Sequence, residues 1–340
     1  MRKRTRVGAP KFKVMERQSM YRIGIDLGGT NIAAGIVNEN FEIVSKVSIP
    51  TGADRPANEI AADMAALCHA VCEKAGIDPS EIASVGIASP GIANHDEGVI
   101  EYCCNIPSFN KFAVCDAVKA GFPVPHVFVE NDANAAAWGE VVAGAAKGTR
   151  DSVMITLGTG VGGGIIIDGK VISGFNYAGA ELGHIVIEVD GAQCGCGRKG
   201  CREAYSSATA LIRMTREKLE ECEAAGRPTI MTELVEKAGK VSGRTAFDAK
   251  RAGDEAGAEV VAKYVHYLAQ GIANIVNIFQ PEVLSIGGGI SNEGDYLLDM
   301  LVPLVRAEAY GQGIVKGADI RIAALRNDAG IIGGAVLGLK

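Results

Sequence analysis

The spacing of apolar residues predicts that strands and helices alternate along most of the chain. Short apolar runs have the length and β-branched content of strands, while an amphipathic stretch with helical spacing covers Ala57–Lys74. In the first part of the chain the pattern predicts strands at Tyr21–Ile25, Ile32–Val37, Ile43–Ile49, Val85–Ala88 and Val127–Glu130. We therefore expect an α/β fold.

The second part of the chain repeats this plan. An apolar strand at 153–156 leads through a glycine–threonine turn into Ile165–Ile167, much as Tyr21–Ile25 leads through its own glycine turn into Ile32–Val37. Beyond it we expect a strand at Val283–Ile286 and helices at Ser207–Glu223, Ala246–Phe279, Asp295–Ala309 and Ala329–Leu339. The repetition indicates a duplicated architecture with one phosphate loop from each half.

Length and composition favour a well-packed protein of two domains. The chain has 340 residues, more than one hydrophobic core usually serves, and 48% of them are hydrophobic. The net charge of −6 argues against a general nucleic-acid surface. No run of about 18 apolar residues and no secretory segment occurs, so we expect a cytoplasmic protein whose nine cysteines are thiols or metal ligands.

The first glycine turn, Asp26-Leu27-Gly28-Gly29-Thr30-Asn31, has the composition of an anion site. Glycine permits positive φ and a close approach of the backbone to a ligand, and successive N–H groups form a concavity for an anion. Asp26 places a carboxylate where a Mg²⁺ ion on that anion could sit. An ordinary glycine hairpin is the alternative.

Three cysteines within eight residues form the most specific pattern in the chain. Cys194, Cys196 and Cys201 are separated by glycines that let the loop fold back, and His184 lies ten residues upstream of the first. Three thiolates and one imidazole make a closed tetrahedral Zn²⁺ site, so this zinc would be structural. A cluster of redox thiols is the alternative.

Carboxylates gather around this pattern and at a strand end. Asp132, after an apolar strand, suits either the cap of a helix or a general base at the sheet edge. Glu181 and Glu203 flank the proposed zinc ligands, so the metal would bring them together with His184 to bind sugar hydroxyls. A solvated surface is the alternative for the two glutamates. The glycines Gly287–Gly289 follow a strand and suit either a flat ligand or a structural turn.

Taken together, these motifs resemble the ROK family of sugar kinases, repressors and related proteins, over nearly the whole chain from Tyr21. The resemblance rests on Asp26–Asn31, Ser89-Pro90-Gly91, Asn105, Glu130–Ala135, Leu157–Gly164, Glu181–His184, Cys194–Cys201 with Glu203, and Gly287–Gly289. It implies an actin/hexokinase-like (ribonuclease-H-like) duplicated fold, with two domains around a cleft, and ATP-dependent phosphorylation of a hexose.

We expect the chain to divide into a tail, which its many basic residues and weak apolar periodicity indicate, and the two domains that the resemblance implies. We expect a disordered basic tail over residues 1–20, unless Met20 is the real start. A small α/β domain would cover residues 21–129, and 328–340 could return to it. A large α/β domain would cover 130–327 and carry the zinc loop 184–201.

Residue by residue, the family pattern implies that Asp132 takes the proton from the sugar hydroxyl. The sugar would be bound by Asn105, Asn131, Asp132, Glu181, His184 and Glu203. ATP and its phosphates would be held by Asp26, Gly28, Gly29, Thr30, Asn31, Thr159, Gly160, Gly287, Gly288 and Gly289. Asp26 would orient Mg²⁺, and His184, Cys194, Cys196 and Cys201 would bind the structural Zn²⁺.

Within the family the chain looks most like the glucokinases, which make glucose 6-phosphate in carbohydrate metabolism. Many of those have a tryptophan shortly after the residue matching Asn105, where the nearest aromatic here is Phe109. An N-acetylmannosamine kinase, then a fructokinase or allose kinase, are the alternatives. A sugar-sensing repressor is the alternative of another class, although no helix pair precedes the first hairpin. A homodimer is implied, without nucleic-acid or membrane partners.

Overall fold

The computed structural model describes residues 21–311 and 313–340. The tail predicted over residues 1–20 and the alternative start at Met20 lie outside the described residues. The chain divides into two compact units. Unit 1 takes the residues up to Met154 together with Gly164–Ala180 and Ala324–Lys340, and unit 2 takes Ile155–Gly163 and Glu181–Ala323. The domain boundary predicted after residue 129 thus falls inside unit 1.

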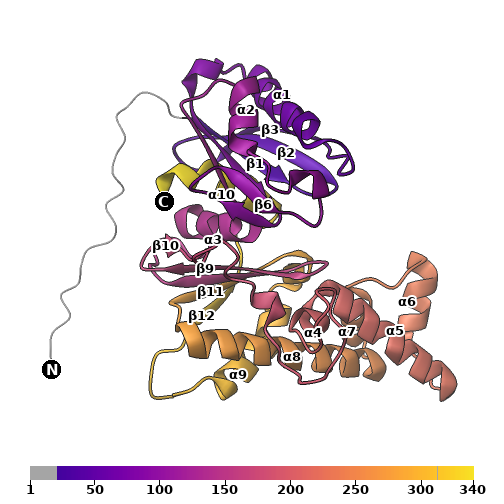
Figure 1. The fold of residues 1–340 in the computed structure, drawn as a ribbon. Helices are drawn as coiled ribbons and strands as arrows, with labels where there is room; N and C mark the ends of the chain where they lie inside the picture. The colour runs from indigo at the N-terminus through magenta and orange to yellow at the C-terminus, as the bar shows by residue number, and fades with distance from the viewer. Residues whose placement is uncertain (1–20, 312) are drawn as a thin grey trace, which may run out of the picture. The chain divides into compact units, whose positions relative to one another are not determined.

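Unit 1 is built on a five-stranded mixed sheet of order β3-β2-β1-β4-β7 (Figure 1). Its strands are β1 (Tyr21–Leu27), β2 (Asn31–Val37), β3 (Ile43–Pro50), β4 (Ile82–Ser89) and β7 (His126–Asn131). The first three pair antiparallel, while β4 pairs parallel with both β1 and β7. All five strands predicted in this part of the chain are confirmed.

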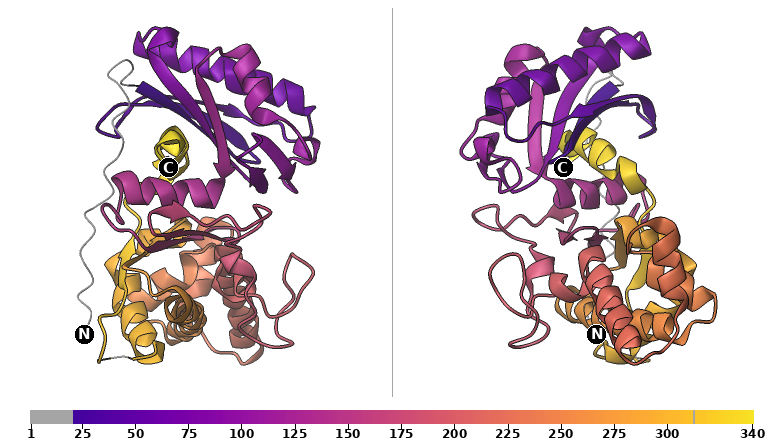
Figure 2. Two further views of the ribbon diagram at one scale, coloured as in Figure 1. Left: turned by 60° about the vertical axis from the view of Figure 1, so that its left-hand side comes forward. Right: turned by 90° about the vertical axis from the view of Figure 1, so that its right-hand side faces the viewer.

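Helices cover both faces of this sheet (Figure 2). One face packs against α1 (Ala57–Ala75) and α2 (Val114–Gly121), where most of the buried apolar side chains of unit 1 lie. The other face packs against α10 (Ala329–Ala335), which is followed by the short helix η6 (Leu337–Leu339). A Cβ on Gly24 of β1 would stand 1.7 Å from the Ile331 carbonyl oxygen, so glycine permits this close packing.

Unit 1 also contains a small ribbon, a further helix and several short helical turns. A two-stranded ribbon joins β5 (Ile92–Asn94) to β6 (Val99–Tyr102), and α3 (Asp132–Ala143) follows β7 directly. Short helical turns occur as η1 (Pro79–Glu81), η2 (Pro107–Phe109) and η5 (Arg326–Asp328). The ribbon is not among the predicted strands, because its two runs are only three and four residues long.

A second five-stranded sheet has the order β10-β9-β8-β11-β12. Its strands are β8 (Ser152–Leu157), β9 (Val161–Ile167), β10 (Lys170–Val171), β11 (Val283–Gly287) and β12 (Asp319–Ile322). The helices of unit 2 are α4 (Glu203–Ser206), α5 (Ala208–Ala224), α6 (Ile230–Ala238), α7 (Thr245–Arg251), α8 (Glu255–Phe279) and α9 (Asp295–Glu308), with turns η3 (Leu182–His184) and η4 (Gly289–Glu293).

One predicted helix of unit 2 is wrong in its extent. The stretch expected as a single helix over Ala246–Phe279 is divided between α7 and α8. Gly253 between them has φ +86°, and Asp254 caps α8 by accepting a hydrogen bond from the Gly257 amide at 2.8 Å. A left-handed glycine followed by a capping aspartate ends one helix and starts the next. Among the helices of the described residues, none combines the length and apolarity needed to cross a membrane.

Candidate functional site

The first glycine turn lies in unit 1 between β1 and β2, as predicted. The Gly28 amide donates to the Asn31 carbonyl oxygen at 2.9 Å and closes the turn. Neither Gly28 nor Gly29 has positive φ, so the expectation that these glycines serve a turn with positive φ is wrong. Glycine is favoured at Gly28 because a Cβ would lie 3.0 Å from the Asn31 carbonyl oxygen. Gly29, Thr30 and Asn31 are exposed, so they are accessible to a ligand.

Thr51, directly after β3, stabilises this turn through two hydrogen bonds. Its hydroxyl donates to the Gly28 carbonyl oxygen at 2.6 Å, and its amide donates to the Thr30 carbonyl oxygen at 2.8 Å. Thr51 is fully buried, so both bonds are shielded from water. Sequence reasoning missed this residue, because it lies outside the motif and after a different strand.

Asp26 precedes the turn and is half-buried. A Cβ on Gly330, at the start of α10, would lie 2.5 Å from its carboxyl carbon, so the helix approaches the carboxylate closely. Burial raises the pKa of the Asp26 carboxyl, and the positive charge of Lys46 acts in the opposite direction. A cation bound nearby would favour the ionised form.

The segment Asn131–Asp132 lies where β7 meets α3. Asp132 was expected as a possible helix cap, but the cap is Asn131, whose Oδ1 accepts from the amides of Ala133 and Asn134 at 2.9 and 3.2 Å. The Asn131 Nδ2 donates to the Gly91 carbonyl oxygen at 3.0 Å. Asp132 is therefore the first residue of α3, and it is exposed there.

Asn105 is exposed in the loop after β6, in the same unit as the first glycine turn. A Cβ on Gly29 would lie 3.7 Å from the Asn105 Cβ, so the two residues are neighbours. The Cys104 thiol donates to the Asn105 Oδ1 at 3.0 Å. Phe109 is fully buried in the core of unit 1, so its ring fills the core rather than an open pocket.

The second glycine turn, Gly158-Thr159-Gly160, lies in unit 2 between β8 and β9. Helix α5 holds it, because the Ala208 amide donates to the Gly158 carbonyl oxygen and the Thr209 hydroxyl donates to the Thr159 carbonyl oxygen, both at 2.8 Å. Directly after the turn, the Val161 amide at the start of β9 donates to the Glu203 Oε2 at 3.0 Å.

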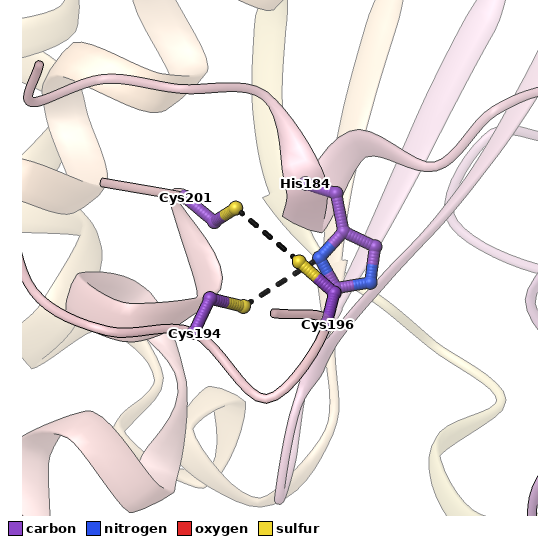
Figure 3. Close-up of side chains that lie close together, drawn as sticks. All are labelled: His184, Cys194, Cys196 and Cys201. Atoms are coloured by element: carbon purple, nitrogen blue, oxygen red, sulfur yellow. Dashed lines mark hydrogen bonds between the residues drawn. The ribbon is translucent and has the colours of Figure 1, made fainter. Parts of the chain in front are cut away.

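The four predicted metal ligands come together in unit 2 (Figure 3). The ligand atoms of His184, Cys194, Cys196 and Cys201 all lie within 4.8 Å of one another. The Cys194 sulfur is 3.8 Å from the His184 Nδ1, and the sulfurs of Cys196 and Cys201 are 3.6 Å apart. Cys194 and Cys201 are buried, while Cys196 is exposed.

The loop between these cysteines folds back as expected. The Cys194 amide donates to the Arg198 carbonyl oxygen at 2.8 Å, and the Gly197 amide donates back to the Cys194 carbonyl oxygen at 3.1 Å. Gly200 has φ +75°, and a Cβ there would lie 1.7 Å from the Glu188 carbonyl oxygen. Glycine is therefore required at this position for the loop to bring Cys201 to the other thiols.

This cluster fits a tetrahedral zinc ion. In a tetrahedral site, Zn–S bonds of about 2.3 Å and a Zn–N bond of about 2.0 Å place two sulfurs about 3.8 Å apart and a sulfur and a nitrogen about 3.5 Å apart. The separations of 3.6 Å between the Cys196 and Cys201 sulfurs and 3.8 Å between the Cys194 sulfur and the His184 Nδ1 are close to these values. Burial raises the pKa of the Cys194 thiol to about 12 and also raises that of Cys201. A bound metal would reverse this by stabilising thiolates.

Glu203 connects the thiol cluster to the second glycine turn. Its Oε1 accepts a hydrogen bond from the Cys194 thiol at 3.5 Å, while its other oxygen binds the Val161 amide. A Cβ on Gly160 would lie 2.3 Å from the Glu203 Oε2, so glycine permits this contact. Both contacts lie inside unit 2.

Glu181 and the glycines after β11 complete the predicted set. Glu181 is exposed at the start of η3, where its carbonyl oxygen accepts from the His184 amide at 3.0 Å. Its proximity to Glu203 stays a prediction. Gly288 has φ +82°, and a Cβ there would lie 2.6 Å from the backbone of Leu157. No protein atom would meet a Cβ on Gly289, so the backbone there is open to a ligand.

The chain is similar to known proteins over most of its length. The family model of the ROK family matches residues 22–340. A glucokinase of Halalkalibacterium halodurans is 36% identical over 93% of this chain and 94% of its own length. An N-acetylmannosamine kinase of Salmonella heidelberg is 29% identical over 94% of this chain and 98% of its own length.

A solved structure has a similar fold. The ROK family glucokinase of Streptomyces griseus, in complex with glucose and AMPPNP, is 35% identical and aligns with a TM-score of 0.77. The alignment covers 93% of this chain and 98% of that one. The likeness therefore extends over both units.

Proposed function

The chain belongs to the ROK family, and on that premise we propose that it is an ATP-dependent kinase that converts glucose to glucose 6-phosphate. The similarity to glucokinases over more than nine-tenths of the chain supports this activity. Two glycine turns, each following a strand and each partly exposed, would supply backbone N–H groups for the phosphates.

One observation of the structure carries the proposal furthest. Glu203 contacts both the Cys194 thiol and the Val161 amide, directly after the second glycine turn. A carboxylate assigned to the sugar therefore lies directly beside a turn assigned to the phosphates. A zinc ion on His184 and the three cysteines would fix this carboxylate and leave the His184 Nε2 for a sugar hydroxyl.

The residues of unit 1 supply the rest of the proposed machinery. Asp132 would accept the proton of the attacking hydroxyl, while Asn105 and Asn131 would orient the sugar through hydrogen bonds. Gly28, Gly29 and Thr30 would hold phosphate oxygens, and Asp26 would hold Mg²⁺ through water. When bound, Mg²⁺ neutralises charge on the triphosphate, which phosphoryl transfer requires.

The remaining assignments follow the family pattern. Glu181 would bind the sugar, Asn31 and Thr159 would contact phosphates, and Gly287, Gly288 and Gly289 would lie beside the adenosine. Zinc would be structural, since four protein ligands leave no open coordination position. We also infer a homodimer, which light scattering of the purified protein would test.

A coupled ATP assay over hexoses and N-acetylhexosamines tests the function. We expect glucose to give the highest kcat/KM. The variant Asp132→Asn should keep glucose binding and lose about 10²–10⁴ in kcat, because it removes the general base. Near-normal turnover of this variant would refute the role of Asp132.

Two other functions remain as outcomes of these experiments. The similarity to an N-acetylmannosamine kinase favours that activity as the second candidate, and a preference for N-acetylmannosamine or fructose in the assay would establish it. Sugar binding without turnover, together with a mobility shift of promoter DNA, would indicate a sugar-sensing repressor instead.

A further inference from the structure

Glu130 is a buried carboxylate that the proposed mechanism leaves without a role. It is 1% exposed and directly precedes Asn131 and Asp132. Its Oε1 accepts from the Asn131 amide at 3.0 Å and from the Asn134 Nδ2 at 3.2 Å. This oxygen therefore binds the residues on both sides of Asp132.

The other oxygen of Glu130 has two basic partners from distant parts of the chain. The His95 Nδ1, in the turn between β5 and β6, lies 3.2 Å from the Oε2. The Lys340 ammonium contacts the same oxygen, from the residue that follows η6. An ionised carboxylate with this little exposure requires such partners, because burial without them costs several kcal/mol.

The segment that carries Lys340 is itself docked against β7 and α3. The Trp138 Nε1 donates to the Val336 carbonyl oxygen at 3.0 Å. A Cβ on Gly338 would lie 2.8 Å from the ring of Phe128, so the chain passes close to β7 there. Lys340 therefore reaches Glu130 from a segment that is fixed at two further points.

We propose that Lys340 and His95 hold Glu130 so that it orients Asn131 and Asp132, which makes Glu130, His95 and Lys340 positioning residues for the general base. This inference rests on the proposed kinase function. None of the three residues needs to contact the sugar or ATP. Their effect is to fix the start of α3, since small displacements of a reacting group strongly reduce the rate.

Loss of the Lys340 charge should release this constraint. Without it, the Glu130 carboxylate keeps only uncharged backbone and amide donors and the His95 ring. It gains stability by rotating toward water, and its Oε1 then leaves the amides beside Asp132. We expect the orientation of Asp132 to become less well defined. The two glycine turns, which Glu130 does not contact, should keep their structure.

The test compares Lys340→Met, which keeps the apolar stem, with Lys340→Arg, which keeps the charge. The matched control is Arg150→Ala, because Arg150 forms an exposed ion pair with Asp168 in the same unit. We expect Lys340→Met to lower kcat with glucose by about ten- to a hundredfold, with the KM for ATP changed less than about twofold. Lys340→Arg should restore most of kcat, and Arg150→Ala should resemble wild type.

A folded Lys340→Met with the kcat of the control would overturn the inference, and so would an equal loss in Lys340→Arg. Folding at the assay temperature is checked by the fluorescence of Trp138. If Lys340→Met does not fold, His95→Phe is judged by the same criteria, because it keeps an aromatic ring beside Tyr177 and removes the donor to Glu130. A wild-type protein without sugar kinase activity would instead refute the proposed function.

Discussion

The stability of unit 1 should depend on pH through Glu130. Burial alone would raise the pKa of this carboxyl, but the hydrogen bond from His95 and the charge and hydrogen bond of Lys340 bring it down to about 2 from its ordinary value of 4.5. The perturbation is Glu130→Gln, which removes the ionisable group and keeps the shape of the side chain.

The direction in which stability changes with pH follows from the lowered pKa of Glu130 in the folded state. A carboxylate that binds protons less readily when folded stabilises the protein above the unfolded pKa, and this stabilisation disappears as the pH falls toward the folded value. The shift corresponds to about 3 kcal/mol at neutral pH. About 1 kcal/mol of this would be lost by pH 4, and about 2 kcal/mol by pH 3.

The chain carries its own reporter for this measurement. Trp138 is the single tryptophan, it lies in α3, and its indole binds the Val336 carbonyl oxygen. Urea unfolding followed by tryptophan fluorescence therefore reports on unit 1 and on the docking of the C-terminal segment. We expect the difference in unfolding free energy between wild type and Glu130→Gln to shrink by about 1 kcal/mol from pH 7 to pH 4.

A difference that stays constant over this range would refute the reasoning, since it would mean that Glu130 titrates alike in the folded and unfolded states. A difference that grows on acidification would mean that burial outweighs the two basic partners. Glu73→Gln, at an exposed position of α1, controls for the loss of one negative charge from unit 1.

Two further predictions concern unit 2. Metal analysis of the purified protein should find about one zinc per chain. The variant Cys201→Ser should lose this zinc, while the control Cys222→Ala, outside the cluster, should keep it. Wild-type protein without metal would contradict the site. Gly160→Ala should lower kcat/KM for glucose by about tenfold or more, because its Cβ would lie 2.3 Å from the Glu203 Oε2 and displace that carboxylate. Gly317→Ala, where a Cβ meets no protein atom, is the control, and equal activity of the two variants would count against the role of Glu203.

Sequence reasoning predicted the parts of the site that are local along the chain. The turn after β1 and the loop from Cys194 to Cys201 each carry their own glycines, so residue types within a short window determined both. His184 was placed with the cysteines because the ligand set of zinc requires a fourth donor. The link from Cys194 through Glu203 to the Val161 amide was not predicted, since it joins three segments that only the folded unit brings together.

Contacts between residues far apart in the sequence were missed for the same reason. Thr51 supports the first glycine turn from the strand after it, and Lys340 reaches Glu130 from the last turn of the chain. Neither residue belongs to a motif, and each has the side chain of an ordinary surface position. The one sequence signal was Glu130 itself, because a carboxylate at the end of a buried strand requires a partner.

The glycines show where a sequence pattern overstates function. Several were predicted to bring the backbone close to a ligand, yet a Cβ on Gly288 would meet the backbone of Leu157 rather than open space. A Cβ on Gly24 would likewise meet the backbone of α10. By contrast, a Cβ on Gly158 or Gly289 would meet no protein atom. Glycines of the first kind are needed for packing, whereas those of the second kind leave the space that a Cβ would fill open to a ligand.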